Sequence, residues 1–596
     1  MPIAASGPAL RKGSEASNFR KIERGVKDAT RSDQLRTGLN AVGELCNPRD
    51  PRFLAATARA VPCAGGMRAG SVLKLSFGLA LLACSKAEPA TLAGAPSGAA
   101  APSVTPAGVG SAAPRAPRPA LATSVGLDGQ LHAAPAAAGR RVYARSLKAW
   151  IYDRPSRSAD RLGYFRAGAS VLVRGERAAI EGCAAGWYPV EPRGFVCAEG
   201  AATLDENDAV VAAYRALAAD FGGKLPYIYG TVRRPGPIYS RLPTRAEAAQ
   251  AESDLDERMA SWLSADGEVG ASYAQQVWLR GAAPPDARVA WESKRTDPLP
   301  NFLAGGRALP TPEGQANHGA DLIVARMKPH QGLSLLTTLL FEGRRYGVTT
   351  DFDVVPTDRL RPIQGSEHHG VELGKGLEFP FALVRTETAK LKRFEHGKLM
   401  DAGPAEYWSV LKLTGKQSFF QHRLYFETEG GKYISDQDAS RLDQAKKMPA
   451  WGKNGERWFD VNISKQTLVA YEGTRAVYAT LISTGEAGLE DPERTKSTKR
   501  GIFRIHTKHV STTMDSDAVG EEFELRDVPY VQYFEEGYAL HGAYWHDRFG
   551  TPKSHGCINL TPEDARRLFF FTEPSLPEGW HSVMQKLTGT VLFVHP

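Results

Sequence analysis

The stretch Ser-His-Gly-Cys-Ile-Asn at residues 554–559 decides how this chain is interpreted, and a histidine-glycine pair, His541-Gly542, precedes its cysteine by sixteen residues. A thiol with a pKa of about 8.5 is mostly protonated at neutral pH, so it becomes a strong nucleophile only beside a proton acceptor or a positive field. The spacing therefore predicts Cys557 as a nucleophile and His541 as its base. Gly556 permits a tight turn, which lets backbone N–H groups around Cys557 point at a developing oxyanion.

The alternative interpretation of Cys557 is structural, because a lone cysteine among Ile and Leu residues is more often a small buried hydrophobe than a nucleophile. The flanking sequence favours the catalytic interpretation. From about Trp458 to Val594 it resembles the L,D-transpeptidase (YkuD) catalytic domain. The resemblance lies in separate stretches: FDVNISKQTL at 459–468, VYATLISTG at 477–485, KRGIFRI at 499–505, the His-Gly pair, the SHGCIN block and GTVL at 589–592.

This resemblance implies roles for individual residues. Cys557 matches the nucleophile and His541 the base, and the backbone carbonyl of Gly542 orients that base. Asn559 stands where many relatives carry Arg, which leaves its contact with a substrate carboxylate open. One departure is the stretch 497–501, Ser-Thr-Lys-Arg-Gly, which lacks the proline that the family commonly shows there. The anion-binding turn of the family matches three residues here: Ser554, His555 and Gly556.

The resemblance also implies a reaction on peptidoglycan. Cys557 attacks the carbonyl of the third residue of a tetrapeptide stem, releases the terminal D-Ala and remains acylated. The acceptor amine belongs to another stem, giving a 3→3 cross-link, or to an envelope protein. No cofactor or metal is expected. Two alternatives stay open: an L,D-carboxypeptidase or endopeptidase that uses the same Cys-His site, and a non-catalytic cell-wall-binding lipoprotein, which the intact His541 and Cys557 count against.

Length and charge bound the architecture and the partners. A chain of 596 residues is too long for one domain. Lys and Arg number 74 and Asp and Glu 66, a net charge of +8, which indicates either a solvated surface or affinity for an anionic polymer. The carboxylate-rich peptides of a cell wall are such a polymer. Nucleic acid is not expected as a partner, because the sequence shows no basic patch interleaved with aromatic residues.

The N-terminal part of the chain resembles an export signal. Residues 1–66 have little periodic apolar content and are predicted to be untranslated or disordered. Residues 67–84 resemble a lipoprotein signal peptide, with basic residues, an apolar run too short to span a membrane, and a terminal Cys84 that would carry lipid. Ser85, rather than Asp, points to the outer membrane, hence to a lipid-anchored periplasmic protein. The alternative is a chance Ala/Leu-rich stretch. The Ala/Pro-rich segment at 85–140 is predicted to be a tether.

The remaining chain is predicted to be mainly β and divided into several domains. Residues 141–200 resemble a bacterial SH3-like β-barrel, in which Cys183 and Cys197 form a disulfide or remain two reduced core thiols. A helix is expected at 204–217, capped by Asp205 or Asn207.

Residues 201–455 are predicted to hold β-rich accessory modules. Tyr346-Gly347-Val348-Thr349 has an echo in Tyr425-Phe426-Glu427-Thr428, which indicates two related strand-turn-strand units. The histidines of this region, His368, His369 and His396, have no metal-ligand spacing. Residues 456–596 are predicted to be the catalytic β-sandwich. It should include a hairpin across Glu472-Gly473 and one helix from Pro562, capped by Thr561.

Overall fold

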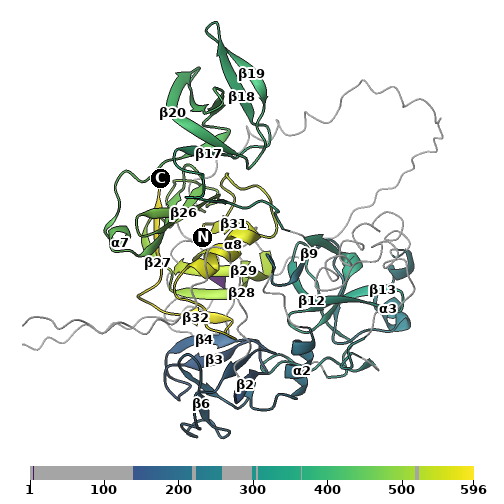
Figure 1. Cartoon of the computed structure of the whole chain (residues 1–596). Helices are drawn as coiled ribbons and strands as arrows, with labels where there is room; N and C mark the ends of the chain where they lie inside the picture. The colour runs from purple at the N-terminus through teal and green to yellow at the C-terminus, as the bar shows by residue number, and fades with distance from the viewer. Residues whose placement is uncertain are drawn as a thin grey trace, which may run out of the picture. The chain divides into compact units, whose positions relative to one another are not determined.

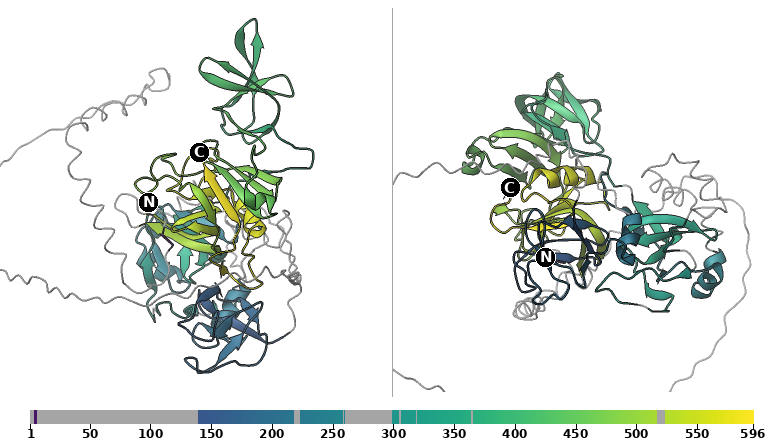
Figure 2. Two further views of the ribbon diagram at one scale, coloured as in Figure 1. Left: turned by 90° about the vertical axis from the view of Figure 1, so that its left-hand side faces the viewer. Right: turned by 60° about the horizontal axis from the view of Figure 1, so that its bottom comes forward.

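The structure is a computed structural model. The predicted signal at 67–84, its Cys84 and all but the last two residues of the predicted tether lie outside the residues that it describes. Among the described residues, no helix is both long enough and apolar enough to cross a membrane. The described chain is mainly β, as the sequence predicts, and Figures 1 and 2 follow its strands from three sides. The described residues are 4–5, 139–217, 223–257, 259, 299–303, 306–317, 319–363, 365–516 and 523–596.

Unit A (residues 141–203) contains seven short strands. Its first strand pairs with the fourth and the last, the second pairs with the third and the sixth, and the fifth pairs with the sixth. A bridge from Val173 to Val190 connects the fourth strand to the fifth. The SH3-like assignment of this unit rests on sequence resemblance and stays a prediction. The strands are β2 (Arg141–Ala144), β3 (Ala149–Tyr152), β4 (Arg161–Phe165), β5 (Ser170–Leu172), β6 (Trp187–Pro189), β7 (Phe195–Cys197) and β8 (Ala202–Thr203).

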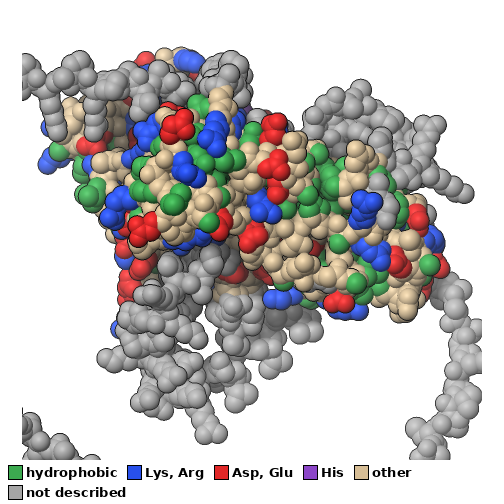
Figure 3. Space-filling view, turned by 90° about the horizontal axis from the view of Figure 1, so that it is seen from below, with side chains coloured by type: hydrophobic (Ala, Val, Ile, Leu, Met, Phe, Trp, Pro, Cys, Tyr) green, Lys and Arg blue, Asp and Glu red, His purple; other side chains and the backbone are tan. Residues whose placement is uncertain are grey.

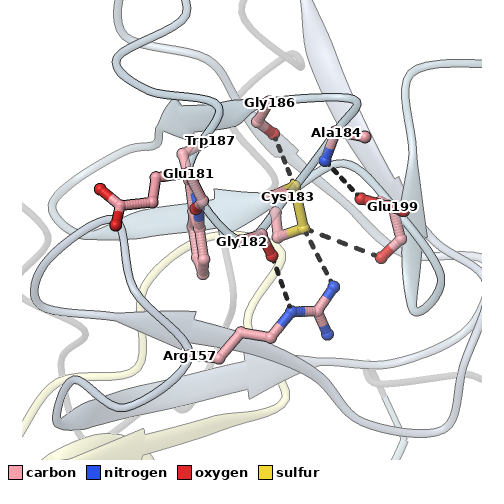
Figure 4. Close-up of a disulfide and its surroundings, with 9 residues drawn as sticks. Arg157, Glu181, Gly182, Cys183, Ala184, Gly186, Trp187 and Glu199 are labelled. Carbon is pink, nitrogen blue, oxygen red and sulfur yellow. Dashed lines mark hydrogen bonds between the residues drawn. A yellow bond between two sulfur atoms is a disulfide. The ribbon is translucent and has the colours of Figure 1, made fainter.

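Cys183 and Cys197 are joined by a disulfide in unit A, with their Cα atoms 5.9 Å apart (Figure 4). The Arg157 guanidinium lies 3.4 Å from the Cys197 sulfur, and the Glu199 carboxylate accepts the Ala184 N–H at 2.6 Å. Although Cys183, Cys197 and Glu199 are close enough together to hold a metal ion, sulfurs in a disulfide offer no thiolate to a metal. The disulfide therefore links two segments of unit A covalently.

Helix α2 (Ala209–Ala216) is shorter than the helix expected at 204–217, and the predicted caps were wrong. Its N-cap is Asp208, whose carboxylate accepts the N–H groups of Val210 and Val211. Asp205 instead accepts the Asn207 N–H in the preceding turn at 2.9 Å. The helix begins late because its buried apolar side chains start at Val210, so the residues before it have no packing that would hold them helical.

Unit B (residues 223–363) repeats the strand pairing of unit A. Its first strand again pairs with the fourth and the last, its second with the third and the sixth, and its fourth, fifth and sixth form a meander. Its elements are β9 (Ile228–Val232), β10 (Pro237–Tyr239), α3 (Arg245–Ala251), β11 (Ile323–Arg326), β12 (Gly332–Phe341), β13 (Arg344–Thr349), β14 (Val354–Pro356), η2 (Thr357–Arg359) and β15 (Leu360–Ile363).

Unit C (residues 381–442) has the same pairing for the third time. Its hairpins can be followed in Figure 1 from the labels β18, β19 and β20. Its strands are β17 (Phe381–Val384), β18 (Lys390–Glu395), β19 (Lys398–Pro404), β20 (Val410–Phe420), β21 (Arg423–Thr428), β22 (Tyr433–Ser435) and β23 (Ala439–Leu442).

The strand registers of units B and C confirm the repeat that the sequence predicts. Tyr346 pairs with Pro356 in unit B, and Tyr425 pairs with Ser435 in unit C, a shift of 79 residues for both partners. The preceding hairpins keep the same shift, since the pair of Phe341 and Arg344 becomes the pair of Phe420 and Arg423. The two units are therefore repeats of one strand arrangement.

The predicted catalytic domain, residues 456–596, is called the catalytic region below and follows helix α7 (Ala450–Lys453). Its first sheet has six strands in the order β16-β26-β25-β24-β33-β27. The hairpin expected across Glu472-Gly473 is confirmed, because β25 and β26 pair antiparallel around it. One edge strand, β16, comes from before unit C and pairs with β26. The strands are β16 (Val371–Glu372), β24 (Arg457–Asn462), β25 (Thr467–Glu472), β26 (Arg475–Leu481), β27 (Gly501–Arg504) and β33 (Val591–His595).

A second set of strands carries the predicted catalytic residues, and its central pairings run from β32 through β28, β29 and β30 to β31. Apolar side chains from this set, the first sheet and helix α8 form one buried core, which includes Phe459, Leu540, Ile558 and Leu568. The strands are β28 (Thr507–Ser516), to which β1 (Ala4–Ala5) pairs, β29 (Phe523–Glu535), β30 (Tyr538–Gly542), β31 (Ile558–Leu560) and β32 (Ser582–Met584).

Helix α8 (Pro562–Phe571) follows β31 directly and confirms the one helix expected in this domain. The Thr561 hydroxyl accepts the Asp564 N–H at 3.1 Å, as an N-cap does. At the other end the buried Lys508 ammonium donates to the carbonyl oxygens of Phe569 and Thr572 at 2.5 and 2.8 Å. Both ends of the helix are thus satisfied by side chains, which fixes the strand that precedes it.

Asp527 joins units A and B to the catalytic region. Its buried carboxylate forms an ion pair with Arg166 of unit A and accepts hydrogen bonds from Ser334 and Thr350 of unit B and from Ser511 of β28. Burial alone would raise the pKa of Asp527, but the Arg166 guanidinium and the hydroxyls of Thr350 and Ser334 hold it well below its usual range. The carboxylate is therefore charged and fully paired where three parts of the chain meet.

Candidate active site

Two parallel strands place the predicted nucleophile and the predicted base on one face. Leu540 of β30 pairs with Ile558 of β31, and His541 pairs with Asn559. Side chains alternate between the two faces of a strand. Leu540 and Ile558 enter the hydrophobic core, whereas Cys557 packs with Ala539 in a different cluster. His541 and Cys557 consequently lie on the same face of this strand pair, with Asn559 beside them.

The turn before Cys557 is ordered by the Ser554 hydroxyl. This hydroxyl accepts the Gly556 N–H at 3.1 Å and donates to the Cys557 carbonyl oxygen at 2.5 Å. Gly556 has φ 126°, and a Cβ atom there would lie 2.9 Å from the Tyr538 ring. Glycine is therefore required on both conformational and steric grounds. The half-buried His555 ring stacks on Phe523, with ring centroids 5.5 Å apart.

Thr498 supports the same turn, and sequence reasoning missed it. Its hydroxyl accepts the Gly485 N–H and donates to the Gly556 carbonyl oxygen, each at 2.8 Å. Thr498 lies in the stretch 497–501, which lacks the proline that the family commonly shows. Its two hydrogen bonds fix this segment instead. A threonine directly before a basic pair and a glycine gave no signal of this role in the sequence.

His541 is oriented as a proton acceptor. Its Nδ1 lies 3.4 Å from the Gly542 carbonyl oxygen, which can only accept, so Nδ1 carries the proton and Nε2 the lone pair. Nε2 is buried and has no hydrogen-bond partner among the described residues. Burial lowers the pKa of His541 to about 4, so the ring is neutral at pH 7. These are the properties that the predicted base needs.

Cys557 is a free cysteine and is almost completely buried. Burial raises the pKa of its thiol, and the Ala539 N–H opposes that rise. The thiol donates to the Gly537 carbonyl oxygen at 3.7 Å. The resting pair is therefore a neutral thiol with a neutral imidazole rather than an ion pair.

Asn559 and His546 form a second polar pair beside Cys557. The Asn559 amide nitrogen lies 3.0 Å from His546 Nε2, and burial lowers the pKa of His546 to about 4, so the neutral ring accepts this hydrogen bond. The Asn559 side-chain oxygen is buried and has no hydrogen-bond partner among the described residues. It can accept a hydrogen bond from a bound substrate. Of the predicted site residues, Cys183 and Cys197 lie in unit A and not in this site, and Cys84 lies outside the described residues.

The segment that contains this site is similar to known proteins. Residues 456–588 match the family model of the L,D-transpeptidase catalytic domain, YkuD. A curated relative from Bacillus subtilis (strain 168), named "Putative L,D-transpeptidase YciB", is 27% identical over 138 residues, which are 19% of this chain and 59% of that protein. The chain thus spans about 59% of the length of this relative.

Solved L,D-transpeptidase structures are also similar to this chain. The catalytic domain from E. faecium is 22% identical and has a TM-score of 0.18, covering 24% of this chain and 98% of that one. L,D-transpeptidase 3 from Mycobacterium tuberculosis is 17% identical with a TM-score of 0.19, covering 31% of this chain and 79% of that one.

The buried state of His541 predicts the acid limit of catalysis. The base must be neutral to accept the proton, and a pKa of about 4 keeps it neutral down to roughly pH 5. We expect kcat/KM for the acyl transfer to stay level from pH 7 to 5 and to fall only as the pH approaches 4. A His546→Gln variant should show the same fall in kcat/KM near pH 4, because protonation of His541 causes it. A fall in kcat/KM near pH 6.5, the pKa of an exposed histidine, would contradict the assignment of His541 as the base.

Proposed function

We propose that the chain is a peptidoglycan L,D-transpeptidase that forms an acyl-enzyme on Cys557. The match of residues 456–588 to the family model supports this activity in general. The observation that carries the finer proposal is the oriented His541, whose unpartnered Nε2 shares a strand face with the Cys557 thiol. The substrate class, a tetrapeptide stem, comes from the family resemblance.

In the acylation step, His541 Nε2 takes the thiol proton as the Cys557 sulfur attacks the carbonyl carbon of the third stem residue. The N–H groups of Ser554 and Gly556 already donate to the Thr484 carbonyl oxygen and the Ser554 hydroxyl, so the Cys557 N–H is the candidate donor of this turn to the oxyanion. The C–N bond to the terminal D-Ala breaks, and His541 returns the proton to the departing amine. A thioester remains on Cys557.

In the second step an acceptor amine attacks the thioester, and His541 takes a proton from that amine. The Cys557 sulfur leaves and is protonated again, so the enzyme returns to its starting state. The acceptor is the side-chain amine of another stem, which gives a 3→3 cross-link, or an amine of an envelope protein. Water as the acceptor would make the protein an L,D-carboxypeptidase or endopeptidase.

Product analysis tests the reaction directly. Purified diaminopimelate-type tetrapeptide muropeptides are incubated with the full chain, Cys557→Ser or His541→Gln, and the products are separated by liquid chromatography with mass spectrometry. We expect dimers linked between two third residues with the wild type and at least a 100-fold loss in either variant. Tripeptides without dimers would assign the site to hydrolysis. Binding to sacculi without any product would favour the non-catalytic wall-binding protein.

We also propose that the protein acts in the periplasm, anchored through lipid on Cys84, with peptidoglycan stem peptides rather than nucleic acid as its partners. The disulfide between Cys183 and Cys197 supports an oxidising compartment. On the face seen in Figure 3, Lys and Arg side chains are interspersed with Asp and Glu side chains, a mixture that gives that face no field of a single sign.

The lipid anchor has its own test. In a Gram-negative host supplied with an alkyne-labelled fatty acid, the wild type should take up label and fractionate with the outer membrane. Cys84→Ser should remain unlabelled and appear in the soluble periplasmic fraction. Equal labelling of both proteins, or none of either, would contradict the anchor.

A further inference from the structure

The loop between His541-Gly542 and the turn before Cys557 contacts units B and C. We call residues 543–553 the catalytic loop, because His541-Gly542 precedes it and Ser554 follows it. Its C-terminal half is bonded to the residues that follow β26: the Gly550 N–H donates to the Ile482 carbonyl oxygen at 2.9 Å and the Lys553 N–H to that of Thr484 at 2.8 Å. Its two aromatic anchors, Tyr544 and Phe549, are almost completely buried.

Unit B contacts the loop at Tyr544. The Tyr229 ring of β9 stacks on the Tyr544 ring with centroids 4.2 Å apart, and the Tyr229 hydroxyl donates to the Asp527 carbonyl oxygen at 2.6 Å. Gly332 of β12 lies so close that a Cβ atom there would be 2.7 Å from the Tyr544 hydroxyl. Tyr544 in turn packs on Trp545, whose ring lies 5.7 Å from that of His541.

Unit C contacts the loop at Phe549. The Tyr407 hydroxyl accepts the Phe549 N–H at 3.0 Å and donates to the carbonyl oxygen of the same residue at 2.9 Å. The neighbouring Trp408 ring meets the Phe549 ring edge to face at 5.8 Å. Phe549 packs on His546 with centroids 4.7 Å apart, and His546 is the residue that bonds to Asn559.

Each unit therefore reaches one polar residue of the site through a short chain of contacts. Unit B reaches His541 through Tyr544 and Trp545, and unit C reaches Asn559 through Phe549 and His546. We propose that Tyr229 and Tyr407 are positioning residues, which hold the catalytic loop so that His541 and Asn559 are oriented beside Cys557. The two accessory units are then parts of the active site. The effect on turnover rests on the proposed function, whereas the clamping of the loop does not.

Two substitutions with matched controls test this role in the full chain. Tyr407→Phe removes only the hydroxyl that bonds Phe549, and Tyr433→Phe removes a hydroxyl of the same unit that bonds Glu427 at 3.1 Å. Gly332→Ala pushes on Tyr544 and on Leu525, whose Cδ2 atom would lie 2.9 Å from the new Cβ atom. Gly430→Ala adds a Cβ atom with only an ordinary contact, 3.8 Å from the Thr428 hydroxyl. Thermal unfolding establishes that each variant is folded.

We expect Tyr407→Phe and Gly332→Ala to speed amide hydrogen exchange in peptides covering residues 543–553. They should also slow product formation by about tenfold or more, since small displacements of reacting groups cost large factors in rate. Both controls should match the wild type. Unchanged loop exchange would overturn the clamp, and faster exchange with full product formation would overturn the positioning role.

If the wild type forms no product, the proposed function is contradicted and the positioning role is tested separately. The rate of Cys557 alkylation by iodoacetamide then replaces turnover as the second measurement. The positioning role predicts that this rate changes at least threefold in Tyr407→Phe relative to Tyr433→Phe. Equal rates in these two variants would overturn it.

Discussion

The parallel pairing of β30 with β31 is the constraint on which the rest of the site depends. It places Leu540 opposite Ile558 in the hydrophobic core and thereby turns His541 and Cys557 to the other face. Because side chains alternate along a strand, a slip of one residue would turn the reactive groups into the hydrophobic core and turn Leu540 or Ile558 to the face that carries the site. The core packing, the capped helix α8 and the glycine turn at residue 556 all act to keep this register.

Burial keeps the His541 imidazole and the Cys557 thiol neutral, and burying polar atoms without partners costs folding free energy. The His541 Nε2 and the Asn559 side-chain oxygen are buried without partners among the described residues, and each such group typically costs about 1–3 kcal/mol. The surroundings offset that cost with dense polar networks, such as Ser554 and Thr498 around the nucleophile turn and the fully paired Asp527 where units A and B meet the catalytic region. In exchange, the imidazole is held neutral and ready to accept a proton.

Local sequence signals predicted the parts of this structure that local interactions determine. The Cys-His pair, the Thr561 cap, the hairpin across Glu472-Gly473 and the repeat of units B and C are all visible as short patterns. The contacts of Tyr407 with Phe549 and of Tyr229 with Tyr544 span 142 residues or more and leave no pattern in either stretch. The start of α2 was mispredicted for a related reason, because packing of Val210 rather than the nearest acidic residue decided it.

The central claim is that His541 activates Cys557 to form a thioester with a stem peptide, and intact-protein mass spectrometry tests it most directly. The wild type, His541→Gln and Cys557→Ser are each mixed with a tetrapeptide muropeptide and quenched in acid within seconds. The account predicts a wild-type adduct equal to the muropeptide minus one D-Ala, mapped to Cys557, and far slower adduct formation in His541→Gln. An adduct that forms equally fast without His541, or that maps to another residue, would contradict it.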